Sequence, residues 1–146
     1  MVNVASSDGR LMPYSESLKQ AFIDASKTSI EACTALMEKF TADIIAKREK
    51  SEGWPSVAYA YAVSKAGEIA STKFIAMEAE KNGRKVLINA CCPGFVNTDM
   101  TRWTGVLTVD EGAKTPVLLA LGDFGETTGG FWKEGGIFEW CPSAGI

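Results

Sequence analysis

Apolar residues recur at helical spacing along two neighbouring stretches between residues 15 and 50. The first stretch carries Leu18, Ala21, Phe22 and Ala25, and the second carries Ile30, Cys33, Met37, Phe40 and Ile44. Residues three and four positions apart share one face of a helix, so each stretch predicts a helix with one apolar side. The polar residues from Ser26 to Ser29 predict the break between the two helices.

Two further helices are predicted in the middle and near the end of the chain. Residues 58–81 are rich in alanine and keep apolar residues at helical spacing, and the pair Asn82-Gly83 is a typical helix stop. Thr108 and Glu111 have the spacing of a capping box and open an apolar segment that ends at Leu121. Pro116 lies inside this segment and predicts a kink or an early end of that helix.

Strands are predicted between and beside these helices. Residues 1–5 alternate around Val2 and Val4 and run into the polar turn Ser6-Ser7-Asp8-Gly9, and residues 85–92 form a nearly continuous apolar run that Pro93-Gly94 ends. Continuous apolar runs are typical of strands buried on both faces of a parallel sheet. Shorter strands are expected at residues 129–133 and 137–140. Alternating strands and helices predict the α/β fold class with a parallel sheet.

Composition narrows the class of protein. The chain has 146 residues, 46% of them hydrophobic and 23% charged, which favours one globular unit. Its apolar runs are shorter than the ~20 residues that span a bilayer, and its start does not resemble a signal peptide, so we expect a cytoplasmic protein without a membrane partner. The net charge of -3 and the scattered basic residues argue against a nucleic-acid partner.

Metal chemistry is not expected. The four cysteines form no C-x-x-C pair, and the chain contains no histidine that could complete a zinc site. We expect reduced and mostly buried thiols, because free cysteine is among the most buried residue types.

Tyr61 and Lys65 are the first candidates for chemistry. Their four-residue spacing places a phenol and an ammonium on one face of the predicted helix. A free tyrosine ionises only near pH ~10, and a neighbouring ammonium favours the ionised phenol, so the pair is suited to acid-base work. Taken alone, such a pair more often forms an ordinary solvated helix face.

The surroundings strengthen that interpretation. Ser7 follows the first predicted strand, and Pro93 and Gly94 follow the strand over residues 85–92. Ligands of open α/β sheets bind outside the carboxyl ends of the strands, where these residues and the start of the Tyr61 helix converge. The sequence therefore predicts one site built from three segments.

These motifs resemble those of the short-chain dehydrogenase/reductase family along the whole chain. The similar segments are V-N-V-x-S-S, then Y-x-x-S-K, then N-A-C-C-P-G-x-V-x-T-D-M. The resemblance implies the C-terminal half of a Rossmann-like, doubly wound parallel sheet. It implies that Ser7 orients a substrate carbonyl, that Tyr61 donates a proton and that Lys65 holds the nicotinamide ribose and tunes the phenol.

The resemblance also assigns the cofactor loop and a substrate pocket. Backbone and side-chain groups of Pro93, Gly94, Val96 and Thr98 are expected to surround the nicotinamide, together with Tyr61 and Lys65. A flat carbonyl substrate would meet Ser7, Phe95 and Trp103. Three further residues that could line an apolar pocket, but are as often core, are Met12, Tyr14 and Trp140.

The spacing between serine and tyrosine indicates a branch of the family. Tyr61 follows Ser7 by 54 positions, a longer separation than most members have, so residues 15–56 are interpreted as a helical insertion. Monomeric carbonyl reductases of the animal type resemble the chain in this insertion. They reduce ketones, aldehydes and quinones with NADPH. In them the insertion covers the surface of the tyrosine helix through which other members associate, so the full-length parent is expected to be a monomer.

The resemblance covers one half of the expected domain only. The Gly-rich turn that binds the pyrophosphate, the residue that selects NADP over NAD, and the family's catalytic asparagine belong to a dinucleotide-binding half that this sequence does not contain. We therefore expect this fragment to be inactive alone. We also expect its first strand to form an open sheet edge through which copies self-associate. Two alternatives stay open, namely an NAD-dependent alcohol or steroid dehydrogenase of the same family and a truncated, non-catalytic product that binds partners.

Overall fold

Helices cover both faces of a small sheet. The computed structural model describes residues 1–56 and 59–142, and within them the sheet order is β1 (Val2–Val4), β2 (Asn89–Cys92), β3 (Phe131–Lys133) and β4 (Gly136–Ile137). The first three strands are parallel, and β4 is antiparallel to β3. The predicted α/β class with a mostly parallel sheet is confirmed.

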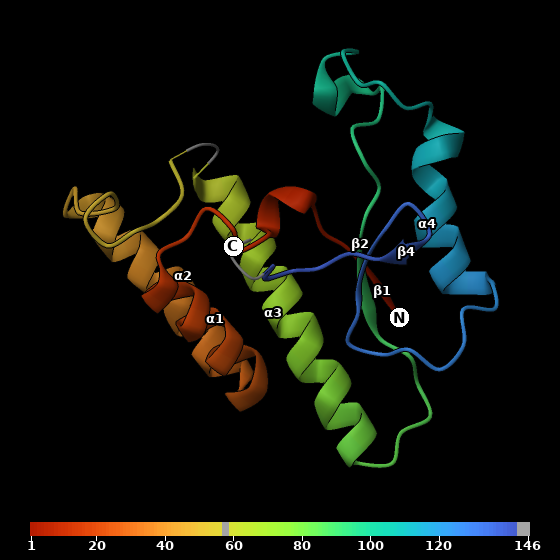
Figure 1. The fold of residues 1–146 in the computed structure, drawn as a ribbon, viewed down its shortest axis with the longest axis horizontal. Coiled ribbons are helices and arrows are strands. Elements are labelled where there is room, and N and C mark those ends of the chain that lie inside the picture. The colour runs from red at the N-terminus through yellow and green to blue at the C-terminus, as the bar shows by residue number, and fades with distance from the viewer. Residues whose placement is uncertain (57–58, 143–146) are drawn as a thin grey trace.

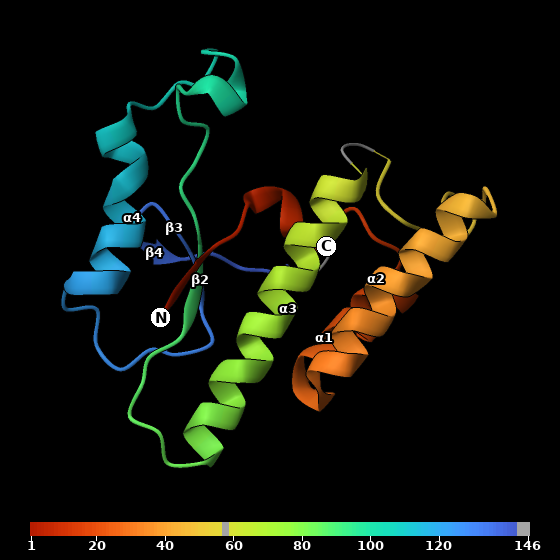
Figure 2. The ribbon, with the colours of Figure 1, turned by 180° about the vertical axis from the view of Figure 1, so that it is seen from behind.

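The helices form layers on either side of this sheet (Figure 1). Helix α3 (Tyr59–Lys81) lies on one face and α4 (Val109–Leu121) on the other, while α1 (Glu16–Thr28) and α2 (Ile30–Ile45) pack on the outer side of α3. Figure 2 shows the same order of layers from behind. Helix α3 is therefore held between the sheet and the α1–α2 pair.

Local side-chain caps explain where the helices begin. The hydroxyl of Ser15 accepts a hydrogen bond from the Leu18 N–H at the start of α1, and the hydroxyl of Ser29 accepts one from Ala32 at the start of α2. The break predicted at residues 26–29 is confirmed, because the single residue Ser29 separates the two helices. The predicted start of α3 at Ala58 lies outside the described residues.

The capping box that opens α4 is confirmed, whereas the early end at Pro116 is wrong. Thr108 and Glu111 bond reciprocally, and the helix continues past Pro116 to Leu121. The proline removes only one N–H from a helix that is capped at its start and packs against β1 and β2.

The strand predicted at residues 85–92 is shorter than expected. Asn89–Cys92, all four buried, form β2, while Val86 is exposed. The register explains the difference: Asn89 lies opposite Val2, and Ala90 lies opposite Phe131. Within residues 85–87, the Leu87 carbonyl oxygen accepts a hydrogen bond of 2.6 Å from the Met1 amino group, but this contact does not extend the strand, so an apolar composition alone does not make the segment a strand.

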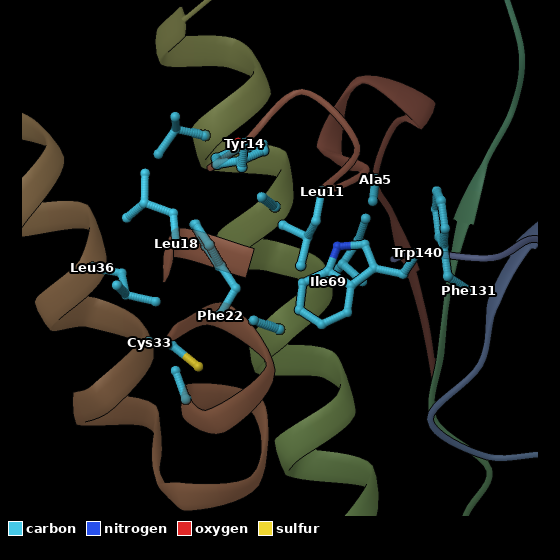
Figure 3. Packing of buried hydrophobic residues seen from close by; sticks show 14 of the residues in the cluster. Ala5, Leu11, Tyr14, Leu18, Phe22, Cys33, Leu36, Ile69, Phe131 and Trp140 are labelled. Atoms are coloured by element: carbon cyan, nitrogen blue, oxygen red, sulfur yellow. The ribbon is translucent and has the colours of Figure 1, made fainter. Parts of the chain in front are cut away.

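The main core lies between α1, α2, α3 and the sheet. Figure 3 shows Phe22 and Leu18 of α1 facing Ile69 of α3, with Phe131 on the sheet side. Phe22 is completely buried and meets the rings of Tyr14 and Trp140 edge to face, with ring centres 5.4 and 6.4 Å apart. Such aromatic pairs stabilise a core beyond the area that they bury.

The apolar stripe predicted on α2 is wrong at one position. Cys33, Met37 and Phe40 pack into the core, but Ile44 is 39% exposed. Asp43 takes the inner position instead. Its carboxylate is buried and accepts hydrogen bonds from Lys39 (2.6 Å), Trp54 Nε1 (2.9 Å) and Arg48 (3.2 Å). A fully partnered carboxylate can occupy a buried position that an apolar pattern would assign elsewhere.

Most of the cysteine thiols are buried, as expected. Cys33, Cys91 and Cys92 are buried and Cys141 is half-buried, and all four are unpaired. Among the helices that the structure describes, none combines the length and the apolar character that a bilayer crossing needs.

Candidate active site

Ser7 and the loop after β2 meet at one edge of the sheet. Strands β1 and β2 are parallel neighbours, so their carboxyl ends lie side by side. Ser7 follows β1 by three residues, and Pro93 is the first residue after β2. The Cys92 Sγ lies 3.6 Å from the Ser7 Oγ, within reach of a weak hydrogen bond. The structure therefore brings Ser7 next to the start of the predicted cofactor loop.

A short 3-10 turn, η1 (Ser7–Gly9), carries Ser7 against α3. The Ser6 side chain caps this turn by accepting a hydrogen bond from the Asp8 N–H, which leaves the Ser7 hydroxyl to other contacts. Gly9 packs directly on α3, where an added Cβ would lie 2.7 Å from the carbonyl carbon of Lys65. Only a residue without a side chain permits this approach. Ser7 is thereby held beside the helical turn that contains Lys65.

Tyr61 and Lys65 share one face of α3, as their spacing predicts. The Lys65 Nζ lies 5.9 Å from the centre of the Tyr61 ring. Tyr61 is 43% exposed, so solvent reaches this residue. Ser64 donates a hydrogen bond to the Tyr61 carbonyl oxygen, in keeping with a structural role for that serine.

The ammonium of Lys65 has two acceptors. Its Nζ donates to the Val4 carbonyl oxygen at 3.0 Å and to Glu68 Oε2 at 2.8 Å. The first contact joins α3 to the end of β1, a few residues before Ser7. The second partner, Glu68, was not predicted from the sequence. Its position three residues after Lys65 on the same helix could have indicated this ion pair.

The loop from Pro93 to Thr98 is closed by its own contacts. Gly94 has a positive φ of 87°, which glycine adopts without strain. Val96 pairs with Leu107 in an isolated bridge, and its carbonyl oxygen accepts the Thr101 hydroxyl at 2.6 Å. The Thr98 N–H donates to the same hydroxyl oxygen at 3.1 Å. The predicted cofactor residues Pro93, Gly94, Val96 and Thr98 thus form one ordered loop beside Ser7.

The predicted substrate residues do not all gather at this place. Phe95 is half exposed and follows Gly94 directly, whereas Trp103 lies after a second 3-10 turn, η2 (Asp99–Thr101), and is 66% exposed. In both ribbon views η2 stands away from the start of α3, with η1 between them (Figures 1 and 2). The structure therefore does not bring the η2 turn to the start of α3.

Two of the three further pocket candidates belong to the core. Tyr14 and Trp140 are buried in the cluster of Figure 3, and Trp140 Nε1 donates to the Gly9 carbonyl oxygen at 2.9 Å. A pocket role for these two residues is wrong, because their rings fill the space between α1, η1 and the sheet. Met12 is exposed on the surface.

Three polar groups lie near this edge of the sheet. The Ser7 hydroxyl lies beside Cys92 at the start of the 93–98 loop, and the Lys65 ammonium, 5.9 Å from the centre of the Tyr61 ring, is anchored at the end of β1. These groups can orient a carbonyl oxygen, give it a proton and bind ribose hydroxyls.

Comparison with known proteins shows that the chain is similar to reductases. The family model described as "Enoyl-(Acyl carrier protein) reductase" matches residues 25–115. Among similar proteins, carbonyl reductase (NADPH) 3 of Mus musculus is 40% identical over 125 residues, which are 83% of this chain and 44% of the relative. Short-chain dehydrogenase/reductase 1 of Saponaria officinalis is 35% identical over 133 residues, covering 90% of this chain and 43% of the relative.

A solved structure supports the fold. Salutaridine reductase from Papaver somniferum superposes with a TM-score of 0.78 at 31% sequence identity, covering 90% of this chain and 44% of the other. The chain thus spans less than half the length of these relatives. Its likeness to each of them is a likeness to one part of a larger domain.

Proposed function

The chain belongs to the short-chain dehydrogenase/reductase family, and we propose that it is the catalytic half of an NADPH-dependent carbonyl reductase. The proposed substrates are ketones, aldehydes and quinones, and the products are alcohols. The observation that carries the proposal is the contact of Lys65 with the end of β1, because it joins the Tyr61 face of α3 to the segment that presents Ser7.

The proposed chemistry divides among three side chains. NADPH, when bound, supplies the hydride that adds to the carbonyl carbon. The Ser7 hydroxyl donates a hydrogen bond that orients the carbonyl oxygen, and the Tyr61 hydroxyl gives that oxygen its proton, so that an alcohol leaves. The Lys65 ammonium stabilises the phenolate that remains and binds the ribose hydroxyls. Solvent then returns the proton to Tyr61.

The loop after β2 completes the proposed cofactor site. Pro93, Gly94, Val96 and Thr98 would border the nicotinamide together with Tyr61 and Lys65, and Phe95 and Trp103 would contact the substrate. Trp103 would have to approach the site for this role, because the η2 turn that precedes it stands away from the start of α3 (Figure 1).

The carbonyl reductase branch is favoured by the segment between Ser7 and Tyr61. Helices α1 and α2 occupy it and pack along α3, as expected for an insertion that covers this helix. The four unpaired thiols support a reducing compartment, so the proposal includes a cytoplasmic location.

The proposal is tested with the chain alone and with a chimera. In the chimera the chain is joined to the part of the mouse carbonyl reductase (NADPH) 3 that it does not match, which is more than half of that relative. We expect the chain alone to show no turnover. We expect the chimera to oxidise NADPH, followed by absorbance, when a quinone or an aromatic ketone is present.

The decisive variant is Tyr61→Phe in the chimera. It should reduce turnover by about a hundredfold or more while NADPH binding, measured by fluorescence, changes little. Ser64→Ala, one turn away and outside the proposed chemistry, is the control. Two results would refute the proposal. One is a folded chimera without turnover, and the other is a Tyr61→Phe variant of the chimera that keeps its turnover. Faster turnover of steroids with NADH would favour another dehydrogenase of the family.

A further inference from the structure

A polar stripe runs along the face of α3 that lies against β1. Tyr61, Lys65, Glu68 and Thr72 succeed one another at spacings of four, three and four residues, which keeps them on one side of the helix. Two of them contact β1 directly: Lys65 donates to the Val4 carbonyl oxygen, and Thr72 accepts a hydrogen bond of 2.7 Å from the Asn3 side chain. Glu68 lies between these two contacts.

The Val4 carbonyl is available to Lys65 because of the way β1 pairs. In the ladder with β2, the Met1 carbonyl accepts from Asn89 and the Ala5 N–H donates to Cys91. Parallel strands use alternate residues for such bonds, so the backbone groups of Val4 point away from β2. An outward carbonyl at the end of β1 thus provides a fixed acceptor for the ammonium.

The hydrogen bonds of the Lys65 ammonium show how Glu68 restricts its position. An ammonium carries three N–H donors. One binds the Val4 carbonyl oxygen at 3.0 Å and a second binds Glu68 Oε2 at 2.8 Å, which leaves one on an ammonium 5.9 Å from the centre of the Tyr61 ring. Two acceptors on two different elements restrict the ammonium far more than one would.

We propose that Glu68 is a positioning residue that, with the Val4 carbonyl, holds the Lys65 ammonium so that its remaining N–H serves Tyr61 and the ribose. This inference rests on the proposed function for its chemical consequence and on the contacts of Lys65 for its geometry. Glu68 itself touches neither substrate nor cofactor.

A second ion pair of α3 shows that the arrangement is not a general property of the helix. Glu78 and Lys81 have the same three-residue spacing, but their charged atoms are 3.4 Å apart and the Lys81 side chain is 74% exposed. The Lys65 side chain is only 22% exposed and has the additional backbone acceptor. Exposed pairs such as Glu78–Lys81 contribute little, so this pair is a matched control.

The geometry is tested by trace acetylation of the chain, with mass spectrometry of the peptide that contains Lys65. Glu68→Ala should raise the acetylation rate of Lys65 by about threefold, the factor that a partly screened ion pair supports. Glu68→Asp should restore most of the protection. Glu78→Ala should leave the rates at both Lys81 and Lys65 nearly unchanged, because the Glu78–Lys81 pair is exposed. Equal Lys65 rates in wild type, Glu68→Ala and Glu78→Ala, with unchanged circular dichroism, would overturn the inference.

The consequence for the reaction is tested in the chimera. Glu68→Ala should lower kcat by about two- to fivefold and leave the KM of the carbonyl substrate nearly unchanged, whereas Glu78→Ala should change neither. If the wild-type chimera has no turnover but Lys65 acetylation still responds to Glu68, the proposed function fails and the positioning role stands. If turnover depends on Tyr61 but neither kcat nor acetylation responds to Glu68, the positioning role alone is refuted.

Discussion

Replacing Gly9 by alanine tests how the end of β1 is held against α3. A Cβ at this position would lie 2.7 and 2.8 Å from the carbonyl carbon and oxygen of Lys65 and 2.9 Å from the backbone nitrogen of Ala66. These are backbone atoms of a long, packed helix, so no side-chain rotation can relieve the overlap. The turn η1 must therefore move away from α3.

The expected cost follows from the overlap and from what moves with it. Overpacking by one methyl group in a rigid core costs about 1–3 kcal/mol. The displacement also strains the hydrogen bond of 2.9 Å from Trp140 Nε1 to the Gly9 carbonyl oxygen. Because Gly9 is not among the glycines with positive φ, the cost is steric rather than conformational. We expect the Gly9→Ala variant to lose about 1–3 kcal/mol of its free energy of unfolding.

Urea unfolding followed by tryptophan fluorescence measures this loss. Gly136→Ala is the matched control, because a Cβ there meets no atom within 4 Å. Its free energy of unfolding should stay within about 0.5 kcal/mol of wild type. Trace acetylation adds a site readout, since moving η1 and β1 from α3 should expose Lys65. A Gly9→Ala variant as stable as Gly136→Ala, with protected Lys65, would show that the approach of η1 to α3 is looser than the structure indicates.

Three further predictions concern stability, thiols and association. Hydrogen bonds from Lys39 hold the pKa of Asp43 below its usual value of about 3.9, so this carboxylate stabilises the fold above that pH and loses its contribution as the pH falls below it. The stability difference between wild type and Asp43→Asn, measured by urea unfolding, should accordingly shrink between pH 7 and pH 3, and a difference independent of pH would contradict this. Burial raises the pKa of the Cys91 thiol to about 11. Iodoacetamide at neutral pH should therefore modify the half-buried Cys141 before the buried Cys91. Early labelling of Cys91 would be inconsistent with the packing of β2. We propose that copies of the chain associate through β1. Val4→Lys should then lower the apparent mass in sedimentation velocity, whereas Val106→Lys, at an exposed position outside the sheet, should not; equal masses for the two variants would argue against association through this edge.

The features that sequence reasoning located are those fixed by short-range interactions. The capping box of Thr108 and Glu111 joins groups three residues apart, so the start of α4 is readable in the chain itself. The carboxyl ends of neighbouring parallel strands meet by necessity, which is why Ser7 and Pro93 could be placed together.

The features that sequence reasoning missed depend on partners far away in the chain. The length of β2 is set by its register with β1 and β3, and an apolar run cannot show where its partners stop. Asp43 replaces Ile44 on the inner face of α2 because Trp54 supplies a donor that no local pattern reveals. For Tyr14 and Trp140 the sequence left core and pocket open, because aromatic side chains occur in both, and the structure places both residues in the core.

The candidate site depends on two faces of one helix. The apolar face of α3, with Val63, Ala66 and Ile69, is completely or almost completely buried, and its polar face carries Tyr61 and Lys65 toward η1 and β1. A helix is stiff over this length, so a rotation that moved either face would move the other. The packing of α1 and α2 on the outer side of α3 therefore fixes the direction in which the phenol and the ammonium point. It follows that a cavity made in α1, as by Phe22→Ala, should disturb Lys65 from a distance, through the orientation of α3 rather than through contact.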